Sequence, residues 1–389
     1  MNFIEYEPVK NWAPRALLRL LFISLLLKLA YLIFTLFILP ESSGFTFDGY
    51  FKMAQRNDSG WYRLIAENWY PEVTDRDDLG YSHGAEYRQS EWAFFPFYPG
   101  INRVLMQLTG ASFDVTGFIY SIVFSTLAVF GFYWFSLNFT RDNKKSFFFA
   151  LLFMLYPFHY YYSMMYTEAV YFTFLVCSFI VIFYRKYIYL PLVIIPLVLV
   201  RPNGIIALVP LYLYFLERNE ILSKKIFHFD LLFSRRIVLQ SMLFLAGPAA
   251  FILYGFYQEH MTGYFNAFSI AQAGWYREFM WPFMSFFRRG DITTQFNSVY
   301  TLLFIALAVI AWKKFPLSLN ILVWTGLLLP LFSGSVTSMP RFISVIFPFI
   351  FLLGDWMYNL RARYYVIGSL AILQFVVFYF CLIGHPFSC

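Results

Sequence analysis

Long runs of apolar residues alternate with short polar segments along most of the chain. A helix of about 20 apolar residues crosses the ~30 Å hydrocarbon core of a bilayer, and several runs approach that length. The pattern therefore predicts an all-α integral membrane protein, a polytopic bundle of about eleven transmembrane helices. The predicted spans are residues 16–39, 115–137, 146–163, 169–184, 187–200, 204–216, 237–257, 298–312, 315–332, 342–359 and 364–383.

Two of these spans, 187–200 and 204–216, are shorter than the others and meet at the sequence RPNG. Proline and glycine together interrupt helices. We expect a broken hairpin or a pair of shortened helices here.

Basic residues gather in alternate connecting segments, which predicts the orientation of the chain. If the N-terminus is cytoplasmic, the cytoplasmic segments hold 17 of the 29 Lys and Arg residues, as the positive-inside rule requires. The first apolar run is longer than the core of a signal peptide and lacks a cleavage site, so it is expected to be a retained anchor. The compact loops fit a bacterial inner membrane about as well as the endoplasmic reticulum. We expect the bacterial inner membrane. The cytoplasmic segments are the N-terminal stretch, 141–145, 185–186, 217–236, 313–314 and 361–363.

The two longest polar segments, 40–114 and 258–297, fall on the opposite, non-cytoplasmic face. The first is rich in acidic residues, Trp and Tyr. Irregular backbone cannot face lipid with unsatisfied polar groups, so these segments must lie at the interface, partly as interfacial helices, or line a cavity. No repeat or linker divides the chain, and residues 1–389 are predicted to form a single transmembrane domain.

Composition and motif content exclude several classes of protein. With 60% hydrophobic and 13% charged residues, the chain has too much apolar surface for a water-soluble globule. The net charge of +7 reflects the topology and predicts no nucleic-acid partner. The three cysteines cannot form a disulfide framework, and the five histidines show no metal-binding spacing. There is no glycine-rich phosphate loop, so neither a nucleotide sugar nor any other cofactor is expected.

Residues 58–70, DSGWYRLIAENWY, form the most informative polar stretch. The stretch resembles the first-loop signature of the PIG-V family, the second mannosyltransferase of GPI-anchor assembly, and of its bacterial relatives in the GT-C class of membrane glycosyltransferases. It departs from that signature at Asn57 and Trp69, where the family tends to have Trp and Gly. The positions in register are Arg56, Asp58, Ser59, Trp61, Tyr62, Ile65, Ala66 and Tyr70.

Further segments resemble the same family in the same order and lie on the predicted non-cytoplasmic side. They extend the resemblance over most of the chain without specifying the sugar or the acceptor. These segments are AFFPFYP (93–99), YTEAVYF (166–172), RPNGI (201–205), AQAGWYREFMWP (271–282) and SMPRFISVIFP (338–348).

Sugar transfer from a lipid-linked phosphate to a hydroxyl needs a carboxylate that accepts the hydroxyl proton. We expect Asp58 in this role, because GT-C enzymes place their catalytic carboxylate in the first external loop. A helix N-cap is the alternative interpretation of Asp58, and Asp48 in FDGYF is an alternative base.

Departure of the phosphate needs cations, and a guanidinium offers a fork of donors that fits a phosphodiester. Arg201, Arg341 and Arg277 are the expected phosphate ligands, although the first two could instead reach the interface or pair with Glu168. No metal is expected, since arginines can stabilise the leaving phosphate; Asp75 and Asp77 keep a metal site open, with a solvated turn as the simpler interpretation.

The substrate cavity is predicted to involve both external loops. The resemblance places the second external loop beside the active site, where Gln272, Trp275 and Tyr276 could contact a sugar. Interfacial anchoring is the alternative for the aromatic residues. A carboxylate near a bilayer is costly unless it faces a wet cavity or a cation, so we also expect Glu168 to line the cavity. The remaining expected cavity residues, from the first loop, are Trp61 and Tyr62.

The sequence therefore predicts an inverting, metal-independent glycosyltransferase, by resemblance a mannosyltransferase. Its partners would be a polyprenyl-phosphate sugar donor, a glycolipid or other envelope acceptor, and membrane lipids. A polytopic transporter or flippase is the alternative, because broken helices and buried charges also describe carriers. A subunit without catalysis is a third hypothesis.

Overall fold

Helices form nearly all of the regular structure in the described part of the chain. The computed structural model describes residues 13–38, 51, 54, 58–83, 86–222, 227–287 and 290–385. One short antiparallel hairpin, β1 (Tyr81–His83) and β2 (Glu86–Arg88), is the exception, and it pairs Tyr81 with Arg88. The all-α class is thus confirmed. The hairpin was not predicted from the sequence.

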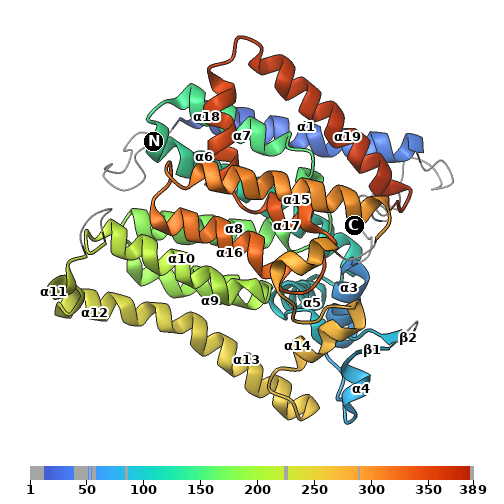
Figure 1. The fold of residues 1–389 in the computed structure, drawn as a ribbon. Helices are drawn as coiled ribbons and strands as arrows, with labels where there is room; N and C mark the ends of the chain where they lie inside the picture. The colour runs from blue at the N-terminus through green and yellow to red at the C-terminus, as the bar shows by residue number, and fades with distance from the viewer. Residues whose placement is uncertain are drawn as a thin grey trace.

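Among the described residues, five helical segments are long and apolar enough to cross a membrane, which is compatible with an integral membrane protein. The long helices run in broadly similar directions (Figure 1). Three shorter apolar helices accompany them: α8 (Glu168–Phe183), η3 with α9 (Tyr187–Val200) and α16 (Leu317–Leu331). The five long segments are α1 (Pro14–Ile38), α6 (Phe113–Thr140), α12 to α13 (Arg235–Thr262), α15 (Ile292–Ala311) and α19 (Arg363–Leu382).

Proline interrupts two of the predicted spans, which are therefore not continuous α-helices. In the predicted span 146–163, α7 (Asn143–Met154) ends before Pro157, and the chain continues as the 3₁₀-helix η2 (His159–Ser163). In the predicted span 342–359, α17 (Met339–Ser344) and α18 (Pro348–Tyr358) are separate helices. Proline cannot donate the i to i−4 hydrogen bond and disfavours helix in the residue before it.

The RPNG sequence separates two shortened helices, as its composition predicts. Arg201 is extended, with φ −152° and ψ 151°, between the end of α9 (Leu190–Val200) and the start of α10 (Asn203–Arg218). Gly204 lies so close to the last turn of α9 that a β-carbon would stand 2.1 Å from the carbonyl oxygen of Leu197. Glycine is therefore required for this tight connection.

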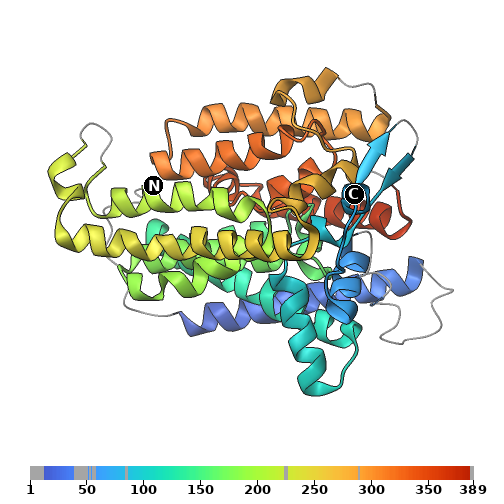
Figure 2. The same cartoon turned by 90° about the horizontal axis from the view of Figure 1, so that it is seen from below.

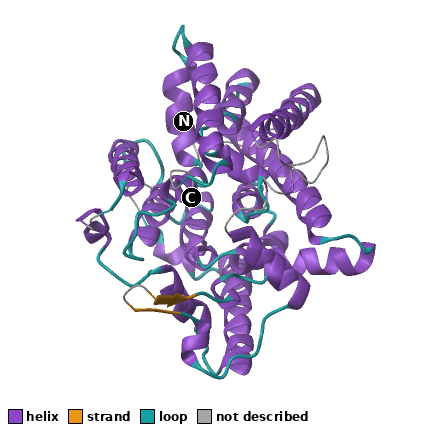
Figure 3. Ribbon diagram, turned by 90° about the vertical axis from the view of Figure 1, so that its right-hand side faces the viewer, coloured by secondary structure: helices purple, strands orange, loops and turns teal. Residues whose placement is uncertain are grey.

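Several short elements gather beside the β1 to β2 hairpin at one end of the bundle, called the α3 end here (Figure 1). The strands of the hairpin are orange in Figure 3. The short elements belong to the two long polar segments, which pack against each other: the amide of Val73 donates to the carbonyl of Met261 at 3.0 Å. The elements are α3 (Asp58–Asn68), α4 (Arg76–Leu79), η1 (Glu91–Ala93), α5 (Phe97–Thr109), α14 (Ala267–Ala271), η5 (Gln272–Trp275) and η6 (Pro282–Phe287).

Phenylalanine rings fill the interior between the helices. Phe135 of α6 packs edge-on against Phe347 at 5.4 Å between ring centroids, and Phe172 of α8 stacks on Phe153 of α7 at 4.6 Å. All four rings are buried. Such pairs add to the burial of apolar area that holds helices together.

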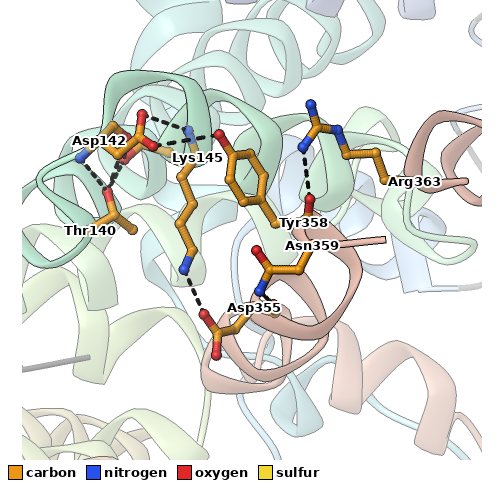
Figure 4. Close-up of polar contacts among 8 residues, drawn as sticks. Thr140, Asp142, Lys145, Asp355, Tyr358, Asn359 and Arg363 are labelled. Carbon is orange, nitrogen blue, oxygen red and sulfur yellow. Dashed lines mark hydrogen bonds and ion pairs between the residues drawn. The ribbon is translucent and has the colours of Figure 1, made fainter. Parts of the chain in front are cut away.

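A polar cluster at the opposite end joins α7, α18 and α19 (Figure 4). Lys145 Nζ lies 2.6 Å from Asp355 Oδ1, and Asp142 accepts backbone N–H bonds as the N-cap of α7. Arg363 Nη1 donates to the carbonyl of Tyr358 at 2.8 Å. These bonds fix the ends of three helices to one another. Between α10 and α14 the chain forms α11 (Phe229–Leu232) and then α12 (Arg235–Met242), η4 (Leu243–Leu245) and α13 (Ala246–Thr262), which together make the long segment given above.

A buried carboxylate caps α16 from a neighbouring helix. Glu217 of α10 accepts the backbone N–H of Ser318 at 3.1 Å and also the hydroxyl of Ser318. Its side chain thus serves donors at the start of α16 that have no partner within that helix.

We expect Glu217→Ala to lower the free energy of unfolding by about 1–3 kcal/mol, because two buried donors lose their acceptor. Thermal unfolding of the purified protein in detergent measures the change. Glu220→Gln, at an exposed acid three residues further on, is the control. Equal midpoints for the two variants would contradict the capping role.

Candidate active site

Two carboxylates and two guanidinium groups form a continuous network at the α3 end. Arg341 Nη1 donates to Asp58 Oδ2 at 2.6 Å, and Arg341 Nε donates to Glu168 Oε1. Arg201 Nη2 donates to the same oxygen of Glu168. Arg341 therefore bridges the two acids, and Glu168 bridges the two arginines.

The start or end of a helix positions each member of the network. Asp58 is the first residue of α3, and Glu168 is the first residue of α8. A carboxylate is favoured at a helix N-terminus by the free N–H groups and the helix dipole. Arg201 lies in the break after α9, and Arg341 lies in the short helix α17.

Burial separates the members of the network into an enclosed part and an accessible part. Glu168 is fully buried, and Arg201 and Arg341 are each 7% exposed. The side chain of Asp58 remains 25% exposed. Buried charges are stable only when they are paired, so Glu168 is the counter-ion that allows two arginines to be enclosed here. Asp58 is the member that a second molecule can reach.

Two buried polar atoms of the network have no hydrogen-bond partner among the described residues. They are Glu168 Oε2 and Arg201 Nη1. A buried donor without an acceptor is costly, and in native proteins it often marks a place for a ligand or water. The free Nη1 of Arg201 could donate to an anionic oxygen without breaking the bond from Nη2 to Glu168.

Arg277 of the second long polar segment adds a third cation. Its Nη1 donates to Gln272 Oε1 at 3.2 Å. The guanidinium carbons of Arg277 and Arg201 each lie 5.8 Å from the centre of the Phe342 ring. Burial lowers the pKa of Arg277, and the nearby charge of Asp58 acts in the opposite direction. The three arginines predicted as phosphate ligands are thus brought together around one aspartate.

The arginines keep Asp58 ionised. Burial acts to raise the pKa of Asp58, but the charge and hydrogen bond of Arg341, with the charges of Arg277 and Arg201, hold that pKa below its ordinary value. Asp58 is therefore a carboxylate at neutral pH. A carboxylate of this kind can accept the proton of a hydroxyl group that becomes more acidic as its oxygen forms a new bond.

Aromatic side chains from both polar segments cover this network. The Trp61 ring stacks on Phe94 at 6.0 Å and meets Trp275 edge-on at 5.8 Å. Tyr62, one turn after Asp58 in α3, forms a 3.3 Å hydrogen bond with the hydroxyl of Thr167. The predicted cavity residues Trp61, Tyr62 and Trp275 are thus gathered beside Asp58.

Other candidates lie elsewhere. Tyr276 is 44% exposed, and its ring packs against Tyr87 of β2 at 5.4 Å, apart from the Trp61 and Trp275 cluster. Asp75 accepts the backbone N–H of Asp77 at 3.1 Å as the N-cap of α4. This contact agrees with the interpretation of Asp75 and Asp77 as a solvated turn. No group of three potential metal ligands occurs among the described residues. The alternative base Asp48 lies outside the described residues.

Three site residues were missed in the sequence. The Arg341 guanidinium lies 4.4 Å from the centre of the Tyr166 ring, a cation–π contact that limits its movement. Phe342 lies between two arginines, and Thr167 holds Tyr62. Tyr166 and Thr167 immediately precede Glu168, and Phe342 follows Arg341, so proximity to a predicted site residue was the available signal.

We expect Glu168→Gln to lower the thermal unfolding midpoint far more than Asp58→Asn. Removing one partner of a buried ion pair costs about 3–5 kcal/mol, and Glu168 serves two arginines. Unfolding in detergent, followed by loss of the monodisperse species, measures the change. Glu67→Gln, at an exposed acid of α3, is the control, and a midpoint for Glu168→Gln equal to that control would contradict the role of counter-ion.

Comparison with known proteins does not identify this arrangement. No protein-family model matches the sequence, and no curated protein matches it.

Proposed function

We propose that the protein is an inverting membrane glycosyltransferase that moves a sugar from a polyprenyl-phosphate donor to a hydroxyl of a glycolipid or other envelope acceptor. One observation carries the proposal: the ionised, accessible carboxylate of Asp58 lies beside Arg341, within reach of the charges of Arg201 and Arg277. A carboxylate for the hydroxyl proton and cations for the phosphate are the two requirements of this reaction.

The transfer step uses these groups as follows. The acceptor oxygen forms a bond to the anomeric carbon on the face opposite the phosphate, and its proton passes to an oxygen of Asp58. The bond between the anomeric carbon and the phosphate oxygen breaks, and its electron pair stays on the polyprenyl phosphate. Configuration at the anomeric carbon is inverted. The free Nη1 of Arg201 supplies one donor for the increasing negative charge.

Glu168 positions the arginines and takes no part in proton transfer. One of its two oxygens, Oε1, accepts hydrogen bonds from the guanidinium groups of both Arg201 and Arg341. These bonds fix the orientation of both guanidinium groups before substrate binds. Donors held in place need no reorganisation when charge develops, and this is the main electrostatic contribution to such catalysis.

The resemblance to the PIG-V family supports a mannosyl donor and a site on the non-cytoplasmic face. The aromatic cluster of Trp61 and Trp275 gives a sugar apolar faces to pack on. We also propose a bundle of about eleven spans in the bacterial inner membrane, with the N-terminus in the cytoplasm. The apolar runs support the number of spans, and the basic connecting segments support the orientation. A carrier, the alternative function, would move the intact lipid-linked sugar across the bilayer.

The first experiment measures release of polyprenyl phosphate from radiolabelled polyprenyl-phosphate mannose by the purified protein with candidate acceptors. We expect Asp58→Asn to reduce turnover by at least about 10²-fold, because the general base is lost. The thermal midpoint should stay near that of the native protein. Asp77→Asn, at an exposed acid of α4, is the control.

Full turnover by Asp58→Asn would remove Asp58 from the mechanism. Transport of unchanged donor into vesicles, with no product, would favour the carrier.

The pH profile tests the electrostatic setting of Asp58. Because its pKa is lowered, the base stays ionised as pH falls, so kcat/KM should be flat from pH 8 to about 5 and fall only near or below the usual Asp value of about 3.9. Arg277→Gln removes one of the positive charges that lower the pKa of Asp58. In this variant the fall of kcat/KM on the acid side of the profile should move to higher pH, whatever the substitution does to the maximal rate. An unchanged position of this fall in that variant would show that Asp58 is not the titrating group.

A further inference from the structure

A groove lies between α5 and the end of α9. Its volume is about 530 Å³. Phe97, Gly100, Ile101 and Val104 line it from α5, at the i, i+3, i+4 and i+7 spacing of one helical face. Leu199 lines it from α9. The lining is almost entirely apolar, as a hydrocarbon chain requires.

The α5 helix has the character of a helix at a membrane interface. It projects sideways from the bundle near the α3 end (Figure 2). Val104 is 49% exposed and Leu108 is 78% exposed, while Asn102 and Tyr98 on other faces are buried. An amphipathic helix with exposed apolar residues lies in the boundary between headgroups and acyl chains. The groove on α5 therefore opens towards lipid.

The end of the groove at Leu199 and the arginine network share the chain segment that follows α9. Leu199 is two residues before Arg201, whose Nη1 is buried and has no hydrogen-bond partner among the described residues. The ring of Phe97 lies 5.4 Å from that of Phe174 in α8, and the ring of the neighbouring Tyr98 lies 5.0 Å from that of Tyr62, both measured between centroids. A chain lying in the groove would thus begin beside a free guanidinium donor.

Arg103 and Trp69 shape the mouth of the groove. Arg103 Nη1 donates to the carbonyls of Ala66 and Glu67 at 3.0 and 2.8 Å, which ties α5 to the end of α3. Trp69 has φ 69° and lies under the Arg103 guanidinium at 5.9 Å. A β-carbon at Gly100 would stand at an ordinary contact distance, 3.5 Å, from the Trp69 ring. Because Gly100 lines the groove, a large side chain at this position would occupy space in it.

A second apolar groove, between α1 and α19, lacks this connection. Phe34, Ile372 and Phe375 are among its lining residues, and Tyr379 is the only polar side chain among the described residues that line it. Phe378, Tyr160 and Tyr161 form successive ring contacts between this part of α19 and Arg341. These three aromatic rings thus lie between α19 and the Arg341 guanidinium.

We propose that the groove between α5 and α9 holds the prenyl chain of the donor, with the phosphate at Arg201 and the chain leaving the site along Phe97, Ile101 and Val104. The inference rests on the proposed function, because it takes the arginine network as the phosphate site. It adds the route by which the lipid enters and the helix that recognises the chain.

Photo-crosslinking tests this inference without requiring turnover. The full-length protein in nanodiscs is exposed to a polyprenyl phosphate that carries a diazirine in its second or third isoprene unit, and labelled peptides are identified by mass spectrometry. We expect label on residues 97–104 and 199, and competition by unlabelled polyprenyl phosphate but not by excess phosphatidylglycerol. Label on residues 371–380 instead, or equal competition by phosphatidylglycerol, would overturn the proposal.

A groove-filling variant gives a second measurement. We expect Gly100→Phe to raise KM for a long-chain polyprenyl-phosphate sugar by about tenfold or more, which corresponds to about 1.4 kcal/mol of lost binding. KM for a donor with a single short prenyl unit should change little, because that donor does not reach the groove. Gly368→Phe, at an open position on α19, is the matched control.

The two proposals can fail separately. If no donor is turned over but the probe still labels residues 97–104, the lipid groove stands and the transferase assignment fails. If turnover occurs and Gly100→Phe, folded by its thermal midpoint, binds both donors as the native protein does, the groove assignment fails alone.

Discussion

The candidate site depends on one buried carboxylate. Glu168 is fully enclosed, and its Oε1 accepts hydrogen bonds from Arg201 and Arg341. Without that charge, Arg201 would be buried without its carboxylate partner and Arg341 would keep only Asp58, which is costly for a marginally stable protein. Because Glu168 neutralises one of the two positive charges, the remaining one is available to Asp58 and to a bound anion.

Much of the fold was predictable because a membrane imposes a simple pattern. Long apolar runs predicted α1, α6, α15 and α19 closely, and the RPNG sequence predicted the break at Arg201. The breaks near Pro157 and Pro348 were missed, since the runs around them stay apolar and only the backbone chemistry of proline interrupts the helix. The β1 to β2 hairpin has strands of three residues each, too short for alternation to be recognised.

The members of the site were predictable individually, but their pairing was not. Charged residues beside prolines in apolar surroundings singled out Arg201 and Arg341, and the cost of burying an acid singled out Glu168. Which cation pairs with which anion depends on how α3, α8 and α17 pack, and no local pattern contains that information. For the same reason Tyr276, next to Trp275 in the sequence, turned out to pack on β2, because its φ of 55° directs the chain away.

The spacing of the charged residues along the chain has a consequence for biogenesis. Asp58 and its partner Arg341 are 283 residues apart. During synthesis at about 5–20 residues per second, Asp58 and Glu168 are made many seconds before Arg341 exists. Glu168 can pair with Arg201, which follows it by only 33 residues. Asp58 has to wait for the C-terminal third of the chain, so the insertion machinery or bound water has to shield its charge until Arg341 is made.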